Sequence, residues 1–128
     1  MFSKKAILKA MDRGLLQISP FDESQIESAH INLHLSGDTS KVIIPAKGFV
    51  LAQTAEKLTL ADSICGLVEG RASLAKKGIS VEQSSTFVEP GTDNTITLEI
   101  FNASDGEVVI NPGDEIAKLF ILKVIDDI

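Results

Sequence analysis

The chain has 128 residues with 18 acidic and 12 basic side chains, so its formal charge is −6 at pH 7. Its 44% hydrophobic and 23% charged residues are ordinary for a soluble globular protein, and the length predicts one domain over residues 1–128. The negative charge argues against broad attraction to nucleic acid or an anionic membrane, and a single cysteine excludes an internal disulfide and multi-cysteine metal sites.

Residues 3–14, "SKKAILKAMDRG", predict a short amphipathic helix near the start of the chain. Ser3 is a possible N-cap, apolar side chains follow at helical spacing, and Gly14 ends the pattern. Neither this segment nor any other contains the long apolar run of a secretory signal or a membrane span. We therefore expect a cytoplasmic protein.

The remaining segments have the pattern of short β-strands. "HINLHLSG", residues 30–37, and "TITLEIF", residues 95–101, alternate apolar and polar side chains with the period of half-buried strands. Glycine, proline, asparagine and aspartate punctuate the apolar runs about every 8 to 12 residues, which is typical of an all-β sandwich or barrel. The sequence therefore predicts a mainly β fold with two short helices.

The second helix is predicted within "VEGRASLAKKGISV", residues 68–81, where the six residues from Ala72 to Lys77 favour helix. A strand, a tight turn at Gly70 and a helix beginning near Ala72 would direct free backbone N–H groups outward, where an anion can bind. Arg71 adds a planar set of donors suited to phosphate, and Ser73 adds a hydroxyl. The alternative is a connecting turn whose arginine pairs with Glu69 or another carboxylate, and the residues alone leave both open.

Several carboxylates are candidates for chemistry. Glu99 lies in the apolar strand 95–101, where it is either solvated on the outer face or lines a pocket as a general base. Glu89, before the turn made by Pro90 and Gly91, could hold a water or a hydroxyl, and Glu82 and Asp93 have weaker claims.

The two histidines, His30 and His34, face the same side of a predicted strand. Because no third ligand is in view, we interpret both as surface or packing residues, and a zinc enzyme is not expected.

In order and spacing, "VEGRASLAKKGISV", "FVEPG", "ITLEIFN" and "INPGDEIAKLFI" resemble the deoxycytidine triphosphate deaminase branch of the dUTPase superfamily. "GFVLAQTAEKLTL" is similar to a further segment of that family, and "SAHINLHLSG" is a fainter match to its Ser-x-Asp-x-Arg-Leu-Gly stretch. The likeness is strongest over residues 48–122.

This resemblance implies a distorted β-barrel of the β-clip type that assembles as a homotrimer, with sites for a deoxypyrimidine nucleotide at the subunit interfaces. It implies Mg²⁺ bound through the nucleotide phosphates, with no protein ligand required for deamination. Arg71, Ala72, Ser73 and Ser85 take substrate-binding positions by this resemblance, and Glu99 becomes the general base that activates water against C4 of cytosine.

The chain also departs from the family pattern. Ala72 replaces a serine, and Lys76 replaces a second arginine that orients the catalytic carboxylate, so it keeps the charge without the bidentate geometry. Glu89 stands where both branches carry aspartate, and its extra methylene displaces the carboxylate by about 1.5 Å. Family members continue into an arm over the triphosphate, whereas this sequence ends at "KVIDDI", so we expect a minimal member with weaker phosphate binding.

Three functional hypotheses follow. The first is a dCTP deaminase-like hydrolase that uses Glu99, with Lys76 and Glu89 as further catalytic candidates. The second is a dUTPase-like pyrophosphatase that uses Glu89 with Mg²⁺. The third is a non-catalytic trimeric module that binds a nucleotide or a protein.

The last segment, "AKLFILKVIDDI", has more apolar residues than a barrel of this length obviously needs. These residues lie either in an interface between subunits or in a buried final strand.

Overall fold

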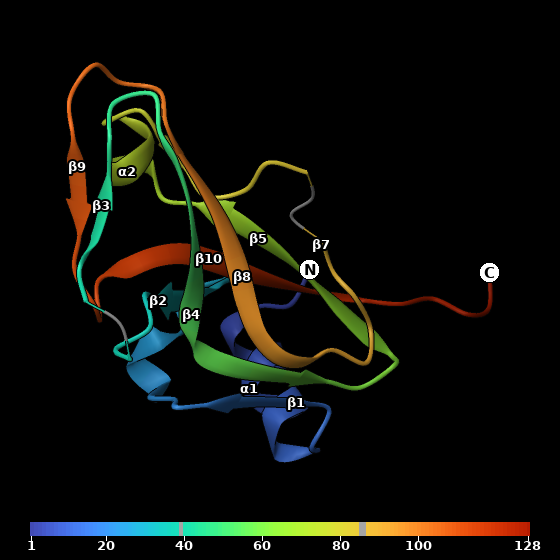
Figure 1. Ribbon diagram of the computed structural model, residues 1–128. Coiled ribbons are helices and arrows are strands. Elements are labelled where there is room, and N and C mark those ends of the chain that lie inside the picture. Colours follow the sequence, from blue (N-terminus) through green and yellow to red (C-terminus); the bar gives the residue numbers. More distant parts are fainter. Residues whose placement is uncertain (39, 85–86) are drawn as a thin grey trace.

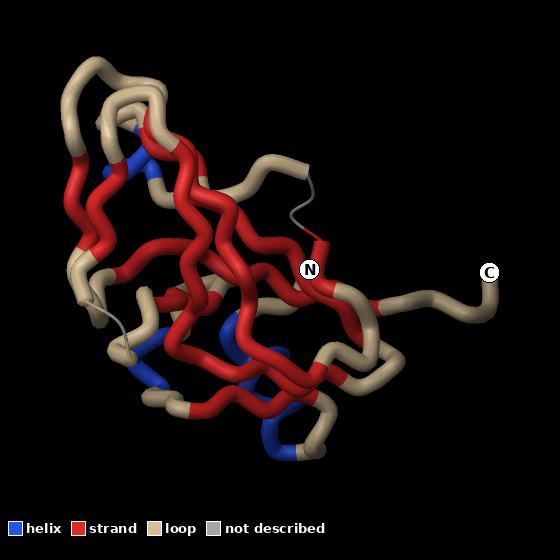
Figure 2. The backbone as a smooth tube through the Cα atoms, viewed as in Figure 1, coloured by secondary structure: helices blue, strands red, loops and turns tan. Residues whose placement is uncertain are grey.

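The computed structural model describes residues 1–38, 40–84 and 87–128. It is mainly β, as predicted (Figure 1, Figure 2). Its helical elements are α1 (Lys4–Asp12), the 3₁₀ turn η1 (Glu23–Gln25) and α2 (Ala72–Ala75). Its strands are β1 (Leu16–Ser19), β2 (Ile31–His34), β3 (Val42–Ile44), β4 (Phe49–Leu60), β5 (Ile64–Gly70), β6 (Ile79–Ser80), β7 (Phe87–Val88), β8 (Asp93–Asn102), β9 (Val108–Ile110) and β10 (Glu115–Lys123).

The strands form two four-stranded sheets and one two-stranded ribbon, with antiparallel pairing throughout the described residues. One sheet has the order β1-β4-β8-β6, the other β2-β10-β5-β7, and the ribbon joins β3 to β9. The hydrogen-bonded pairing between the described strands does not close into one continuous barrel. The predicted barrel is therefore distorted into separate sheets.

The core lies between the sheets and follows from alternation along the long strands β4 and β8, which pair over most of their length (Figure 1). Leu58 and Leu60 on β4 and Leu98 and Ile100 on β8 are buried, and they belong to one cluster that takes residues from both sheets. Each such side chain contributes about 1.5–3 kcal/mol through burial.

Helix α1 forms at the predicted position. The Ser3 hydroxyl accepts a hydrogen bond from the Ala6 amide at 3.2 Å, which is the expected N-cap. Ile7 and Ala10 are buried against the core, and Gly14 ends the helical segment with φ of 72°, a conformation that favours glycine.

The final strand answers a question that the sequence left open. Strand β10 lies between β2 and β5, and its apolar residues Ile116, Ala117, Leu119 and Ile121 are buried within the chain. Their burial accounts for part of the apolar surplus of "AKLFILKVIDDI", in line with the buried final strand that the sequence allowed, whereas Ile125 and Ile128 at its end are exposed.

Beyond β10 the chain leaves the body of the molecule (Figure 1). The Val124 amide still donates to the Ser63 carbonyl at 2.9 Å, but residues 125–128 are exposed. None of the helices in the described part of the chain is long and apolar enough to span a membrane.

Candidate functional site

A cavity of about 230 Å³ opens beside strand β8. Its apolar wall contains Val68, Val81, Val88 and Leu98, and three acidic side chains (Glu82, Glu89 and Glu99) also line it. This volume is below the roughly 300–1,000 Å³ of sites that enclose drug-sized ligands. The cavity therefore suits a single small ring rather than a complete nucleotide.

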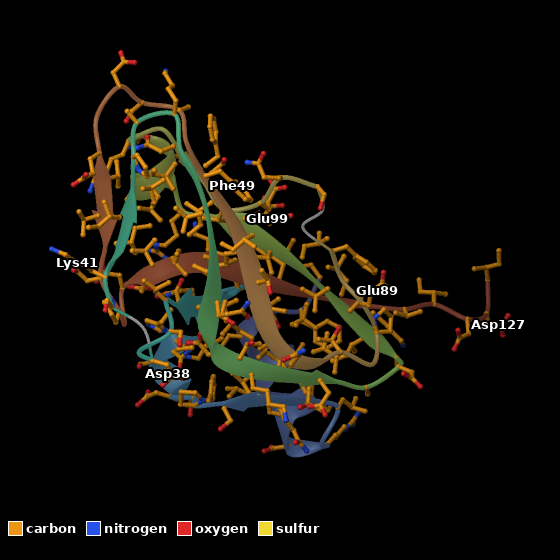
Figure 3. All side chains as sticks on the ribbon, in the orientation of Figure 1. Asp38, Lys41, Phe49, Glu89, Glu99 and Asp127 are labelled. Carbon is orange, nitrogen blue, oxygen red and sulfur yellow. The ribbon has the colours of Figure 1, made fainter. Side chains whose placement is uncertain are left out.

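Glu99 lines this cavity, which is the second of the two placements that the sequence allowed (Figure 3). Its side chain is half-buried, and Oε1 accepts from the Gln83 amide at 3.3 Å and the Ser84 hydroxyl at 3.4 Å. Within the described residues, Oε2 accepts no hydrogen bond. As far as the described residues show, the carboxylate is thus held through one oxygen by two long hydrogen bonds, while the other oxygen accepts none, which suits a base that must take a proton.

The other acidic candidates divide into two groups. Glu89 and Glu82 line the same cavity as Glu99, although Glu89 is exposed to solvent (Figure 3). Asp93 does not line it, because Asp93 accepts from the Thr59 hydroxyl at 2.9 Å and pairs with Lys57 at 3.3 Å. The hydrogen bond from the Thr59 hydroxyl is the largest single cause that holds the pKa of Asp93 below its usual value, and Lys57 lowers it further through a hydrogen bond and its charge.

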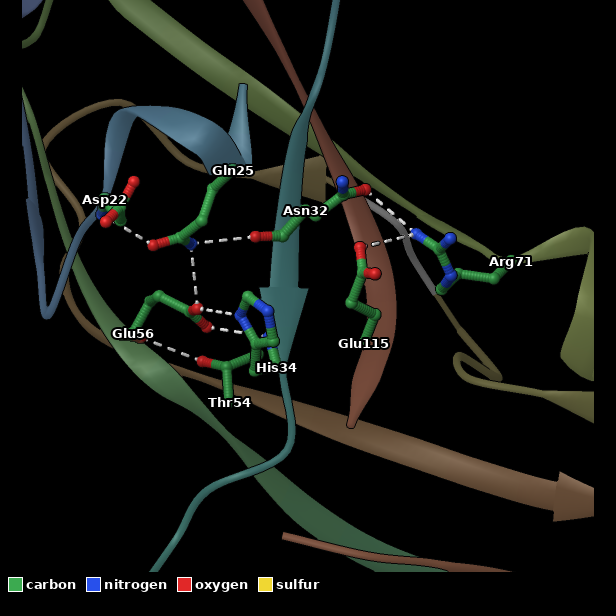
Figure 4. Close-up of polar contacts among 8 residues, drawn as sticks. All are labelled: Asp22, Gln25, Asn32, His34, Thr54, Glu56, Arg71 and Glu115. Carbon is green, nitrogen blue, oxygen red and sulfur yellow. Dashed lines mark hydrogen bonds and ion pairs between the residues drawn. The ribbon is translucent and has the colours of Figure 1, made fainter. Parts of the chain in front are cut away.

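Arg71 lies elsewhere, at the end of β5 (Figure 4). Its Nη1 donates to Asn32 Oδ1 at 2.9 Å and pairs with Glu115 Oε2 at 3.4 Å. Arg71 therefore does pair with a carboxylate, as one of the two alternatives from the sequence allowed, and that carboxylate is Glu115 rather than the neighbouring Glu69. Asn32 and Glu115 line a polar hollow of about 180 Å³, so Arg71 contacts two residues of a hollow different from the Glu99 cavity, although Arg71 itself lines neither.

The segment after Arg71 differs in detail from the prediction. Gly70 is the last residue of β5 rather than a tight turn, and Arg71 is the extended N-cap residue of α2. The helix has four residues instead of the expected six, because the chain turns away towards Gly78, whose φ is 88°.

The side chains of this segment are free to meet a ligand. Ala72 and Ser73 are exposed, and their amides find no acceptor among the residues that the structure describes. Lys76 is also exposed, and it forms no ion pair with any residue that the structure describes. The predicted substrate position Ser85 lies outside the described residues.

Sequence reasoning missed a buried polar cluster beneath Arg71 (Figure 4). Glu56 is 2% exposed and accepts from the His34 amide at 2.9 Å, from His34 Nδ1 at 2.7 Å and from Gln25 Nε2 at 3.1 Å. Because a carboxylate only accepts, the Nδ1 atom carries the imidazole proton. His34 is accordingly a packing residue, as predicted.

A signal for this cluster was present in the sequence. In "FVLAQTAEKLTL", Glu56 has the same two-residue phase as Leu58 and Leu60, which are buried, so alternation points its carboxylate inward. A buried carboxylate needs hydrogen-bonding partners, and the nearby β2 supplies one in His34. The polar face predicted for residues 30–37 is also less solvated than expected, because Asn32 on β2 and Ser36 just beyond it are buried.

Across residues 1–38, 40–84 and 87–128, no group of three or more histidine, cysteine, aspartate or glutamate side chains could hold a metal ion. Within one chain the cavity lined by Glu99 and the hollow beside Arg71 share no lining residue. The predicted phosphate ligand and the predicted base are therefore not brought together by the fold of a single chain.

Comparison with known proteins identifies the family. A family model described as "dCTP deaminase-like" matches residues 36–124. A curated relative from Sulfurihydrogenibium sp. (strain YO3AOP1), named "dCTP deaminase, dUMP-forming", is 30% identical over 98% of this chain and 85% of its own length. A relative of the same name from Methanosphaera stadtmanae is 34% identical over 80% of this chain, which spans only 51% of that relative.

Solved structures confirm the dUTPase-like fold. The 2'-deoxycytidine 5'-triphosphate deaminase from Agrobacterium tumefaciens superposes with a TM-score of 0.75 at 14% identity, covering 94% of this chain and 46% of that one. The EIAV dUTPase superposes with a TM-score of 0.70 at 21% identity, covering 88% of this chain and 89% of that one. Through the family model and its curated relatives, this chain belongs to the dCTP deaminase-like family.

Proposed function

We propose that the protein deaminates the cytosine of a deoxycytidine nucleotide by hydrolysis, with Glu99 as the general base. The observation that carries this proposal is the half-buried Glu99 carboxylate in a small, largely apolar cavity, with Oε1 fixed and Oε2 available. The apolar wall suits the face of a pyrimidine ring, and family membership supports this substrate class.

The reaction needs one group that takes a proton and returns it. Glu99 removes a proton from water as the water oxygen bonds to C4 of cytosine. The protonated carboxyl then supplies a proton to the amino nitrogen, the C4–N bond breaks, and ammonia leaves. Cytosine and water thereby give uracil and ammonia.

The phosphates would bind at the segment that follows β5. Arg71 provides a guanidinium held by Asn32, while Ser73 and the free amides of residues 72 and 73 provide further donors. Mg²⁺ would be bound through the phosphates, since the described side chains form no metal-binding cluster. The role of Ser85 remains the prediction drawn from the family resemblance.

A complete site would then require a second protomer. Leu51 is the cross-strand partner of Glu99 and is 61% exposed, and Phe49 on the same strand is 54% exposed (Figure 3). An apolar surface of this kind is typical of an interface, so a neighbouring copy packed there would bring its own residues towards Glu99. From the family resemblance, we therefore propose a homotrimer of single dUTPase-like domains (residues 1–128), in which Arg71 of one protomer faces Glu99 of another.

A second activity is favoured by one observation, which is that Glu89 lines the same cavity as Glu99. In that activity Glu89 would position a water for attack on a phosphorus atom and release pyrophosphate from dUTP.

The test is an assay of the purified protein with dCTP or dUTP and Mg²⁺, in which ammonia and pyrophosphate are followed separately. General base catalysis contributes about 10²–10⁴-fold, so Glu99→Gln should reduce ammonia release at least about a hundredfold. Glu107→Gln is the matched control, because Glu107 is an exposed glutamate outside both cavities. Ammonia release that survives in Glu99→Gln would refute the assignment of the base.

The same assay separates the alternatives. Pyrophosphate release from dUTP that is lost in Glu89→Gln would establish the second activity. A protein that releases neither product, yet gains thermal stability with nucleotide by RT ln(1 + [L]/Kd), would be a non-catalytic binder.

A further inference from the structure

A hollow of about 240 Å³ lies on another part of the molecule, between α1 and the residues where β5 begins and β10 ends. Its floor is apolar and includes Phe2, Leu15 and Ile64. Phe2 and Leu15 are only partly buried, so the floor keeps apolar surface that a ligand can shield from water.

Three cations stand around this floor: Lys9 on α1, Arg13 at its C-cap and Lys123 at the end of β10. None of the three forms an ion pair with another residue in the described part of the chain, and no carboxylate of that part lines the hollow. The Ser63 hydroxyl adds a neutral donor. Positive charge is thus concentrated at one hollow of a chain whose net charge is −6.

The end of the helix explains only part of this arrangement. Lys9 and Arg13 follow the general preference for basic side chains near a helix C-terminus, where they offset the partial negative charge of the last carbonyls. Lys123 comes from β10, so the helix does not account for it. None of the three lines the Glu99 cavity or the hollow beside Arg71, so the proposed nucleotide site does not use them.

Backbone hydrogen bonds hold the walls, so the hollow is formed without a ligand. The Leu15 amide donates to the Ala10 carbonyl at 2.9 Å, and the Phe2 amide donates to the Ile121 carbonyl at 2.8 Å. A hollow formed in advance reduces the entropy that binding would otherwise cost.

The size and chemistry of the hollow limit its ligand. Its volume of about 240 Å³ is below the roughly 300–1,000 Å³ of sites for drug-sized molecules, so it suits a short chain better than a complete nucleotide. A guanidinium and two ammonium groups match a carboxylate. The apolar floor favours a carboxylate that carries a hydrocarbon chain over a small hydrated ion.

We propose that the hollow lined by Lys9, Arg13 and Lys123 binds a small amphiphilic anion, namely a short aliphatic carboxylate. The carboxylate of the ligand pairs with these cations, and its hydrocarbon chain covers Leu15 and Ile64. This site is separate from the nucleotide site and does not rest on the proposed deaminase function.

The first test compares ligands on the unmodified, isotope-labelled protein by NMR titration. Hexanoate should shift the amide signals of Ser63, Ile64 and Lys123, with saturation in the millimolar range, and should leave those of Gln83 and Glu99 unchanged. From acetate through butanoate to hexanoate, the affinity should rise about fourfold for each methylene that enters the hollow. Hexanol has the same chain without the charge, and it should bind about tenfold more weakly than hexanoate.

The second test removes the charges. Lys9→Gln with Arg13→Gln should weaken hexanoate binding about tenfold and leave hexanol binding unchanged. Lys4→Gln with Lys5→Gln is the matched control, because it removes the same charge from the same helix at exposed positions that do not line the hollow. At about 0.15 M salt, charges more than about 8 Å apart are largely screened, so the control should keep its hexanoate affinity. Circular dichroism verifies that both variants fold.

A third variant fills the hollow. Ala6 also lines it, and leucine is a good helix former, so Ala6→Leu should fold and should lose the binding of both hexanoate and hexanol.

The proposal is overturned if hexanoate causes no saturable shift at Ser63, Ile64 and Lys123, or if it binds no more tightly than hexanol. Equal loss of hexanoate affinity in the two double variants would also overturn it. Shifts confined to Gln83 and Glu99 would place the ligand in the catalytic cavity instead, with the same consequence.

Discussion

The sharpest stability prediction concerns Glu56→Ala, which removes the acceptor at the centre of the cluster in Figure 4. Glu56 is 2% exposed and accepts three hydrogen bonds, from the His34 amide, the His34 imidazole and Gln25. A donor left without a partner costs about 1–3 kcal/mol, and Glu56→Ala removes the acceptor of three partly buried donors at once. We expect the free energy of unfolding to fall by about 3–5 kcal/mol.

Two further variants calibrate this value. Glu56→Gln keeps the shape and one carbonyl acceptor, so its loss should be smaller, about 1–3 kcal/mol. Glu115→Ala removes a glutamate that is 44% exposed and paired at 3.4 Å with Arg71. Because exposed ion pairs contribute about 0–1 kcal/mol, we expect the free energy of unfolding to fall by no more than this amount.

The measurement is urea unfolding followed by far-UV circular dichroism, because the chain has no tryptophan or tyrosine for fluorescence. Protein concentration is kept constant, since association shifts the apparent midpoint. The reasoning is refuted if Glu56→Ala is no more destabilising than Glu115→Ala.

The same substitution should also reach the phosphate segment. Gln25 Nε2 donates both to Glu56 and to the Asn32 carbonyl, and the Asn32 side chain holds Arg71. Loss of Glu56 should therefore let Gln25 and Asn32 move, so that the Arg71 guanidinium is held less firmly. We expect nucleotide affinity to fall in Glu56→Ala.

Three smaller predictions follow from individual contacts. Glu115→Gln frees Arg71 from an exposed ion pair and should tighten nucleotide binding by no more than about fivefold, measured by calorimetry; weaker binding would show that Glu115 positions the arginine instead. The Ser24 amide lowers the pKa of Asp22 below its unfolded value, so this stabilisation is present above about pH 4 and is lost as pH falls through the folded-state pKa. Asp22→Asn should therefore flatten the acid limb of the stability profile, and an unchanged limb would refute the assignment. Gly78→Ala should cost about 1 kcal/mol or more in urea unfolding, because φ is 88° and an added Cβ would lie 3.1 Å from a backbone nitrogen; an unchanged midpoint would contradict this.

The sequence predicted most of the fold because local signals agreed with the tertiary structure. The Ser3 cap, the Gly14 terminator and the alternation around Glu99 all lie where the patterns placed them. The length of α2 was overestimated, because helix propensity over residues 72–77 does not register the turn that leads to Gly78.

The site was harder to predict because its residues come from distant parts of the chain. Alternation could place Glu99 on a face but could not show that Gln83 and Ser84 would hold its Oε1 atom. The pairing of Arg71 with Glu115 joins residues 44 positions apart, and no local pattern distinguishes this partner from the neighbouring Glu69.

The central claim is that Arg71 of one protomer and Glu99 of another complete a single deaminating site. The most direct test is complementation between Arg71→Ala and Glu99→Gln, co-expressed with different tags and purified through both. We predict that each variant alone releases no ammonia from dCTP and that the mixed assemblies do, because some of their sites contain both native residues. Mixed assemblies that carry both tags and stay as inactive as the single variants, beside an active unmodified protein, would contradict the account.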